Sequence, residues 1–133
     1  MTTELFWMTL TILMTSLFWL AYVLNRIAVR GLIRTLDASK AEACDDLSSW
    51  AQRAAAAHRN AVENLVLFAP AVLLLAHLGI STGITQTAAA IYFLARLAHY
   101  AVYLAGIPAA RTLCFAVGWA STVALLLTAL GWL

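Results

Sequence analysis

The sequence predicts an all-α integral membrane protein, a bundle of four transmembrane helices. Of its 133 residues, 64% are hydrophobic and only 11% are charged, with a mean hydropathy of +0.88. These values lie outside the range of soluble globular proteins. A helix needs about 20 apolar residues to cross a bilayer, and the stretches that approach this length are Leu5–Leu24, Leu65–Ile80, Ile84–Leu104 and Thr112–Leu133. We expect one membrane domain over residues 1–133.

The first apolar stretch is expected to remain in the protein as a span. It begins with Glu4 and no basic residue, and its run from Leu5 to Leu24 is longer than the core of a signal peptide. No cleavage site of the small-x-small type follows it. A cleaved signal peptide is therefore the weaker interpretation.

The second span is short, but the sequence before it favours helix. Residues 47–64 are rich in alanine and contain no glycine or proline. We therefore expect one long helix that begins outside the bilayer near Leu47. Asp45, Asp46 and Ser48 are its candidate caps. Pro70 falls inside the span, where neighbouring helices can tolerate a kink.

Basic residues predict the orientation. They are absent from the second loop, residues 81–83, and gather in the first loop at Arg26, Arg30, Arg34 and Lys40. Since basic loops stay in the cytoplasm, both termini should lie on the non-cytoplasmic side. Trp19 and Trp119 fall deep in the spans and are expected to be packing residues.

Several functional classes lack their sequence features. The net charge of +2 comes from eight basic and six acidic residues scattered among helix ends, so no basic face for nucleic acid is expected. Cys44 and Cys114 lack the spacing of a metal or redox site. The chain has no HExxH motif, no Ser/His/Asp order and no paired catalytic carboxylates. We expect no metal.

A charged constellation stands where the second span begins. Arg59 and Glu63 are four residues apart and share a helix face, so they can pair, and Asn60 lies on a neighbouring edge. One interpretation is a purely structural ion pair at the end of a helix. Ionisable groups at the edge of hydrocarbon are costly unless they are paired or face a polar cavity, which makes a binding site the other reading.

A second constellation lies in the third span. Arg96, His99 and Tyr103 stand at i, i+3 and i+7, which makes one polar stripe on an apolar helix. By the predicted topology this stripe and the Arg59–Glu63 face lie at the same end of the bundle. The two helices are expected to present donors and acceptors to one wet cleft, although a purely structural network remains an alternative.

The head of the fourth span can attract an anion. Proline is common in a first helical turn, and a helix N-terminus offers unpaired N–H groups and a positive dipole end. Arg111 adds a full positive charge there, and Thr112 follows it. A thiol held at such a place loses its proton more readily. The alternative is that Arg111 is only a loop residue that sets topology.

Three motifs carry a resemblance to a known family. They are HRNAVEN at residues 58–64, RLAHYAVYL at residues 96–104 and PAARTL at residues 108–113. In this order, with four spans, the chain resembles a bacterial member of the MAPEG family, the membrane-associated proteins in eicosanoid and glutathione metabolism, and is similar to microsomal glutathione transferases. The resemblance implies a homotrimer in a bacterial inner membrane, with glutathione as cosubstrate bound between protomers at the cytoplasmic side.

The resemblance also assigns roles to residues. It implies that Arg111 is the catalytic residue that stabilises the glutathione thiolate. Members of the family also use an arginine from the first helix, for which Arg26, Arg30 and Arg34 all remain candidates. Where animal enzymes often carry a further basic residue, this chain has Ala56. The residues implied to bind glutathione are Arg59, Asn60, Glu63, Arg96, His99, Tyr103 and Thr112.

Two functions from different classes follow. The first is a membrane-embedded glutathione transferase or peroxidase, whose small apolar electrophile or lipid hydroperoxide arrives through the bilayer. The alternative is a noncatalytic membrane protein that binds an anionic lipid or metabolite in the same basic cleft. A proton or ion path is weaker, because no polar stripe runs through the other three spans.

Overall fold

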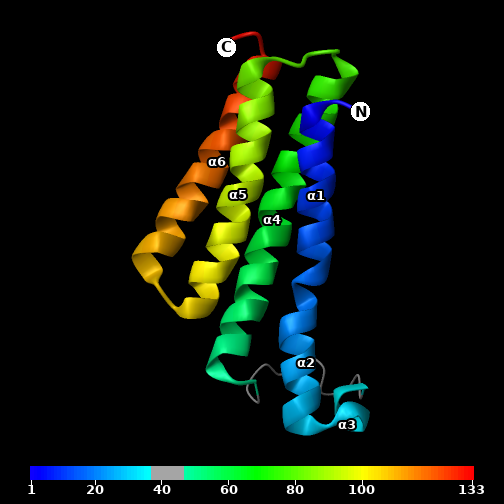
Figure 1. Cartoon of the computed structure of the whole chain (residues 1–133), viewed down its shortest axis with the longest axis vertical. Helices are drawn as coiled ribbons and strands as arrows, with labels where there is room; N and C mark the ends of the chain where they lie inside the picture. Colours follow the sequence, from blue (N-terminus) through cyan, green and yellow to red (C-terminus); the bar gives the residue numbers. More distant parts are fainter. Residues whose placement is uncertain (37–46) are drawn as a thin grey trace.

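The computed structural model describes residues 1–36 and 47–133, and Lys40, Cys44, Asp45 and Asp46 lie outside them. Its helices run roughly antiparallel, and both termini lie at the same end of the bundle (Figure 1). Their bounds are α1 Thr3–Leu17, α2 Trp19–Arg30, α3 Leu32–Leu36, α4 Ser49–His77, α5 Gly83–Ala105 and α6 Pro108–Ala129.

Four of these segments are long and apolar enough to cross a membrane: Thr3–Arg30, α4, α5 and α6. The prediction of an all-helical, multi-pass membrane protein is confirmed. The helix ends differ from the predicted spans, because polar residues continue the apolar runs as helix. The first span extends beyond Leu24 to Arg30, and the fourth already begins at Pro108.

The first span is broken at Phe18, which separates α1 from α2. Tyr100 of α5 lies against the break. Its ring stacks on the Phe18 ring with centroids 3.7 Å apart, and its hydroxyl donates to the Phe18 carbonyl over 3.2 Å. Neither glycine nor proline marks this place in the sequence. A tertiary contact accompanies the break, so local sequence reasoning did not predict it.

Helix α4 has 29 residues, about 43 Å at 1.5 Å per residue, which exceeds the apolar thickness of a bilayer. It continues as helix through Pro70. Ser48 occupies its cap position but makes no side-chain cap bond. Instead, Asn25 of α2 accepts from the Ser48 amide and donates to the Ser48 hydroxyl, both over 3.1 Å. The predicted start near Leu47 thus lies beside α2.

The core lies between α1, α4, α5 and α6. Phe68 of α4 and Tyr92 of α5 stack with ring centroids 3.7 Å apart and are almost fully buried. Buried alanines, among them Ala57 and Ala89, line the same helices. Such small side chains let helices approach closely, since dispersion contacts hold membrane bundles together. The packing therefore fixes the register of α4 against α5.

Hydrogen bonds of Glu4 connect α1 to the start of α5. Its carboxylate is only 2% exposed and accepts hydrogen bonds from the hydroxyls of Ser81 and Thr85. Thr85 also belongs to the capping box that begins α5 with Thr82. Because a buried carboxylate is costly without such donors, these contacts hold the terminal end of the bundle together.

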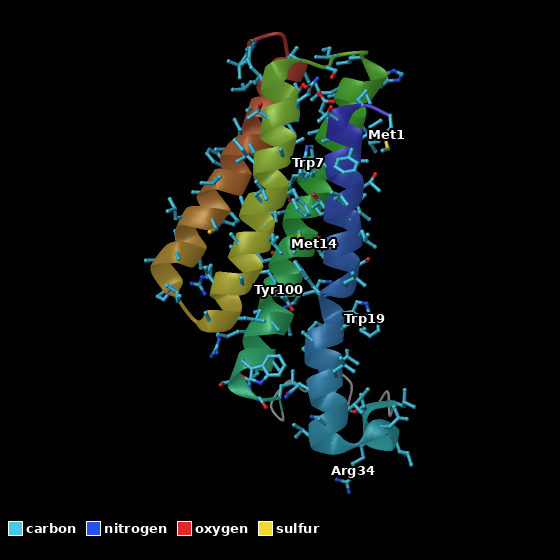
Figure 2. The ribbon with its side chains drawn as sticks, viewed as in Figure 1. Met1, Trp7, Met14, Trp19, Arg34 and Tyr100 are labelled. Atoms are coloured by element: carbon cyan, nitrogen blue, oxygen red, sulfur yellow. The ribbon has the colours of Figure 1, made fainter. Side chains whose placement is uncertain are left out.

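The outer surface of the single chain is strongly apolar, with side chains projecting from every helix (Figure 2). Trp19 points away from the bundle and is 43% exposed, and Trp119 is 57% exposed. The single chain does not bury either tryptophan, so any packing role for them lies outside the intrachain core. Depth along a span does not determine which side of the helix faces the bundle, and both side chains are largely exposed in the single chain.

Candidate functional site

Arg96 is the most deeply buried charged residue of the predicted constellations. Its side chain is 2% exposed, and one terminal nitrogen donates to the Asn60 side-chain carbonyl of α4. Its Nε and Nη1 atoms are buried and have no hydrogen-bond partner among the described residues. Gly118 of α6 lies against the arginine stem, and a Cβ there would lie 3.3 Å from Arg96 Cδ. A guanidinium so placed joins α4, α5 and α6.

A chain of ring contacts runs from the core toward the α5–α6 turn. His99 is 3% exposed and meets the edge of the Tyr103 ring, with centroids 5.5 Å apart. The Arg111 guanidinium lies over the Tyr103 ring at 4.8 Å from its centroid. This cation–π contact orients the charge without neutralising it. Tyr103 therefore positions Arg111 at the first turn of α6.

A cleft of about 200 Å³ opens beside Arg111. Arg53 of α4 forms its other side, and its Nε donates to the Leu104 carbonyl at the end of α5 over 2.8 Å. Gly106 and Pro108 contribute the turn between the helices. No acidic side chain among the described residues lines this cleft. Two cations and a helix N-terminus facing one small space favour an anion there.

Three predicted site residues do not line the Arg53–Arg111 cleft within one chain. Arg59 and Glu63 are exposed on α4, and neither makes an ion pair or hydrogen bond within the described residues. The pairing that their spacing allows is therefore not formed within the described residues of the single chain. Both side chains are exposed, and a solvent-exposed ion pair gains little. Thr112 is exposed, and its hydroxyl donates to the Pro108 carbonyl over 3.1 Å.

Of the three arginine candidates from the first helix, two lie on α2, which packs against α4. Arg26 and Arg30 are half-buried on α2, and Arg34 is exposed on α3 at the end opposite the termini (Figure 2). None of them lines the Arg53–Arg111 cleft. The choice among them stays open within a single chain.

Arg53 and Tyr92 were not among the residues predicted for the site. Arg53 stands seven residues before Asn60, and Tyr92 stands four residues before Arg96. The same helical spacing that linked Arg96, His99 and Tyr103 therefore includes both of them. Arg53 directly precedes an alanine run, so it resembled an ordinary residue at the start of a helix. A lone tyrosine in an apolar helix resembles an ordinary core residue.

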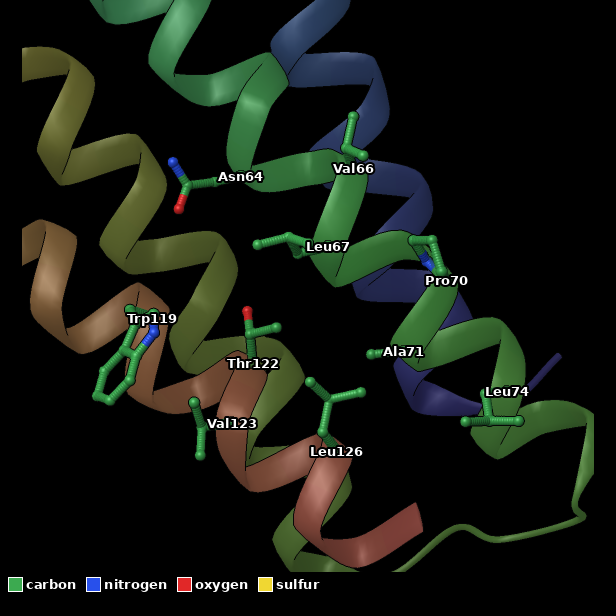
Figure 3. Close-up of a pocket in the computed structure, with 10 residues that line it drawn as sticks. All are labelled: Asn64, Val66, Leu67, Pro70, Ala71, Leu74, Trp119, Thr122, Val123 and Leu126. Atoms are coloured by element: carbon green, nitrogen blue, oxygen red, sulfur yellow. The ribbon is translucent and has the colours of Figure 1, made fainter. Parts of the chain in front are cut away.

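An apolar groove of about 290 Å³ lies between α4 and α6 (Figure 3). Its walls carry Leu67, Pro70 and Leu126, with Trp119 at one end. Asn64 also lines it and donates to the Asn60 carbonyl one turn away over 2.8 Å. The groove thus begins one helical turn from the Asn60–Arg96 contact, and it suits an apolar molecule.

The described residues gather no group of three histidine, cysteine or carboxylate side chains that could hold a metal ion. The residues around the cleft can act on a ligand through their charges and dipoles. Cations, ring edges and a helix end surround a small cleft, and none of its lining residues brings a nucleophile of its own beside Arg111. Such an arrangement can bind an anion or lower the pKa of a thiol that a ligand brings.

Comparison with family models decides the assignment, because the model of the MAPEG family matches residues 5–131. The chain belongs to the MAPEG family. No curated protein and no solved structure matches it. Membership makes this MAPEG protein an integral multi-pass membrane protein of the kind that serves glutathione and eicosanoid metabolism. The predicted resemblance is confirmed at the level of the family.

Proposed function

We propose that this MAPEG protein is a membrane-embedded glutathione transferase or peroxidase acting on apolar electrophiles or lipid hydroperoxides. Glutathione enters from the cytoplasmic side and places its thiol beside Arg111. The cation and the N-terminal end of α6 favour the thiolate, which then attacks the apolar partner. The chain contributes electrostatic stabilisation and orientation, and the borrowed thiol is the nucleophile.

One observation carries the proposal: Arg111 lies over the Tyr103 ring at the edge of the cleft with no carboxylate among its described contacts. A cation that already had an acidic partner would have little attraction left for a thiolate. The ring fixes the guanidinium without consuming its charge. The remaining N–H donors are therefore available to an incoming anion.

The groove between α4 and α6 supports an apolar second substrate. Its lining is almost wholly hydrocarbon, with Asn64 and Thr122 as its polar exceptions. A hydrophobic electrophile dissolved in the bilayer would enter it at little cost in desolvation. We place the electrophile there, with its reactive end at the Asn64–Trp119 end of the groove, which is the end nearer to the start of α6 and the proposed thiol.

The exposed charges of α4 support assembly into a homotrimer. Glu63 lies near the middle of α4, roughly 21 Å from its start at 1.5 Å per residue. A bare carboxylate where the span begins, at the edge of the hydrocarbon, would be costly in lipid. A neighbouring copy would cover Arg59 and Glu63 and turn them toward a shared polar site, to which an arginine of the α2–α3 region could be added.

A noncatalytic protein that binds an anionic lipid or metabolite remains the second candidate, since the same two-arginine cleft favours any anion. The experiment that separates the two uses protein purified in mild detergent. Glutathione binding is measured by isothermal titration calorimetry, and conjugation is followed with a chlorodinitrobenzene. Binding together with turnover supports the transferase. Binding without turnover of this electrophile or of a lipid hydroperoxide favours the noncatalytic candidate.

A further inference from the structure

We infer that Arg53 binds a carboxylate of the thiol ligand and so selects an anionic thiol peptide over a neutral thiol. The inference rests on the proposed function and adds a specificity-determining residue to the same cleft. Arg53 comes from the alanine-rich start of α4, outside the motifs that carried the family resemblance.

The position of the Arg53 head group is fixed on two sides. Its Nε donates to the Leu104 carbonyl over 2.8 Å. Its flat face lies against Gly106, where a Cβ would lie 3.5 Å from Nε and 3.6 Å from Cζ. Gly106 has a φ of 74°, a left-handed conformation that glycine adopts without strain. The turn therefore bends tightly and leaves room for the guanidinium.

This anchoring leaves the ligand-binding edge of the guanidinium available. A guanidinium has five N–H donors in a rigid plane, and the Leu104 carbonyl uses the one on Nε. The terminal nitrogens have no hydrogen-bond partner among the described residues. They form the fork that binds a carboxylate through two parallel hydrogen bonds. The side chain is thus held ready for a planar anion.

The charge of the cleft points to the same ligand class. Among the described residues, Arg53 and Arg111 both line it, no acidic residue does, and the N-terminus of α6 adds a positive dipole end. Two like charges facing one space repel each other unless an anion lies between them. The cleft holds about 200 Å³, less than the roughly 300 Å³ or more of a complete ligand pocket. It therefore accommodates one anionic end of a thiol peptide.

Arg53 also has a simpler role, because a cation that donates to a C-terminal carbonyl stabilises the end of α5. The test must separate this role from ligand recognition. Arg53→Gln suits the purpose, since its amide can still donate to the Leu104 carbonyl while the charged fork is lost. Arg53→Lys is the matched control that keeps the charge and loses the planar fork.

The experiment measures the Kd of three thiols for wild type, Arg53→Gln and Arg53→Lys, together with the Tm of each variant. The thiols are glutathione, its glycyl ethyl ester, and an analogue in which hydrogen replaces the γ-glutamyl α-carboxylate. Arg53→Gln should weaken glutathione about tenfold or more, the usual effect of losing a charge-assisted bond. One of the two analogues should be affected less than about threefold, since it already lacks the carboxylate that Arg53 holds. Arg53→Lys should give an intermediate loss.

Equal weakening of all three thiols would overturn the inference, because a structural role acts on every ligand alike. Unchanged affinity of Arg53→Gln for glutathione would overturn it as well. Failure of wild type to bind any of the thiols would instead contradict the proposed function itself. The two failures are therefore distinguishable in one set of titrations.

Discussion

Arg96 shows how strongly a single residue constrains this site. It is almost fully buried, and its one hydrogen bond in the described structure goes to the neutral amide of Asn60. Two of its nitrogens remain without partners there. A buried cation in this state depends on each acceptor that it has. Asn60 is therefore as much a part of the fold as a candidate ligand residue.

Replacing Asn60 by alanine should lower the free energy of unfolding by about 1.5–3 kcal/mol, the usual contribution of a hydrogen bond to a charged group. Asn60→Asp should retain stability, because a carboxylate of the same shape pairs with Arg96. Unfolding in mixed micelles with rising denaturing detergent measures both. Equal stability of Asn60→Ala and wild type would show that the Asn60–Arg96 contact contributes little.

The structure brings some of the predicted site residues together and leaves others apart, for a physical reason. Helical spacing put Arg96, His99 and Tyr103 on one face, and the structure brings Tyr103 to Arg111. Spacing also put Arg59 and Glu63 on one face, but it says nothing about what packs there. In the structure Asn60, on the adjoining edge, faces α5 instead. Contact across helices depends on rotation of the whole element, which no short motif encodes.

At the scale of elements, α4 and α6 together shape the apolar groove. Its existence was not predicted, because it depends on how far two helices of similar hydropathy separate along their length. Trp119 was expected to be a packing residue, and it lies at the end of this groove (Figure 3). Hydropathy predicted four spans, but neither the break at Phe18 nor the groove leaves a local signal in apolar sequence.

Filling the groove should affect the apolar substrate selectively. Val123 lines it and is half-buried, so Val123→Phe should raise the KM for a bulky electrophile about tenfold while leaving the Kd of glutathione within about twofold. Steady-state kinetics at saturating glutathione measures the first, and calorimetry measures the second. Leu94→Phe on the exposed face of α5 is the matched control. A KM equal to wild type in Val123→Phe would exclude this groove as the electrophile site.

At the scale of the whole molecule, the bundle has two ends with different chemistry. The termini and residues 78–82 lie at one end, and α3 and the starts of α4 and α6 lie toward the other (Figure 1). Arg53 and Arg111 belong to these two helix starts. The excess of basic residues at the second end predicts that it faces the cytoplasm. Cytoplasmic glutathione would then reach the cleft directly from solution.

Cysteine labelling tests this orientation. A Cβ added at Gly83 would meet no heavy atom of the described residues within 4 Å, so the start of α5 accepts a side chain there. In a background without Cys44 and Cys114, Gly83→Cys should react with a membrane-impermeant maleimide from the non-cytoplasmic side. Leu36→Cys, exposed on α3, should react from the cytoplasmic side. The reverse pattern would contradict the topology.

Native mass spectrometry in mild detergents tests the proposed assembly. We expect a trimer to dominate, because exposed Arg59 and Glu63 and a largely apolar surface favour burial against further copies. Glu63→Leu removes one of the charges that favour burial against a neighbouring copy, so it should raise the share of monomer as well as weaken glutathione binding. A monomer that dominates in every mild detergent would argue against sites shared between protomers.

The titration of bound glutathione tests the central claim most directly. At saturating ligand, the ultraviolet absorbance of the thiolate is followed against pH in wild type, Arg111→Ala and Glu63→Ala. Wild type should hold the thiol pKa below that of free glutathione. Arg111→Ala should raise it by at least one unit, a loss of about 1.4 kcal/mol of thiolate stabilisation. Glu63→Ala should weaken binding with little change in that pKa. If wild type and Arg111→Ala bind glutathione equally and titrate alike, Arg111 does not stabilise a thiolate and the transferase account is contradicted.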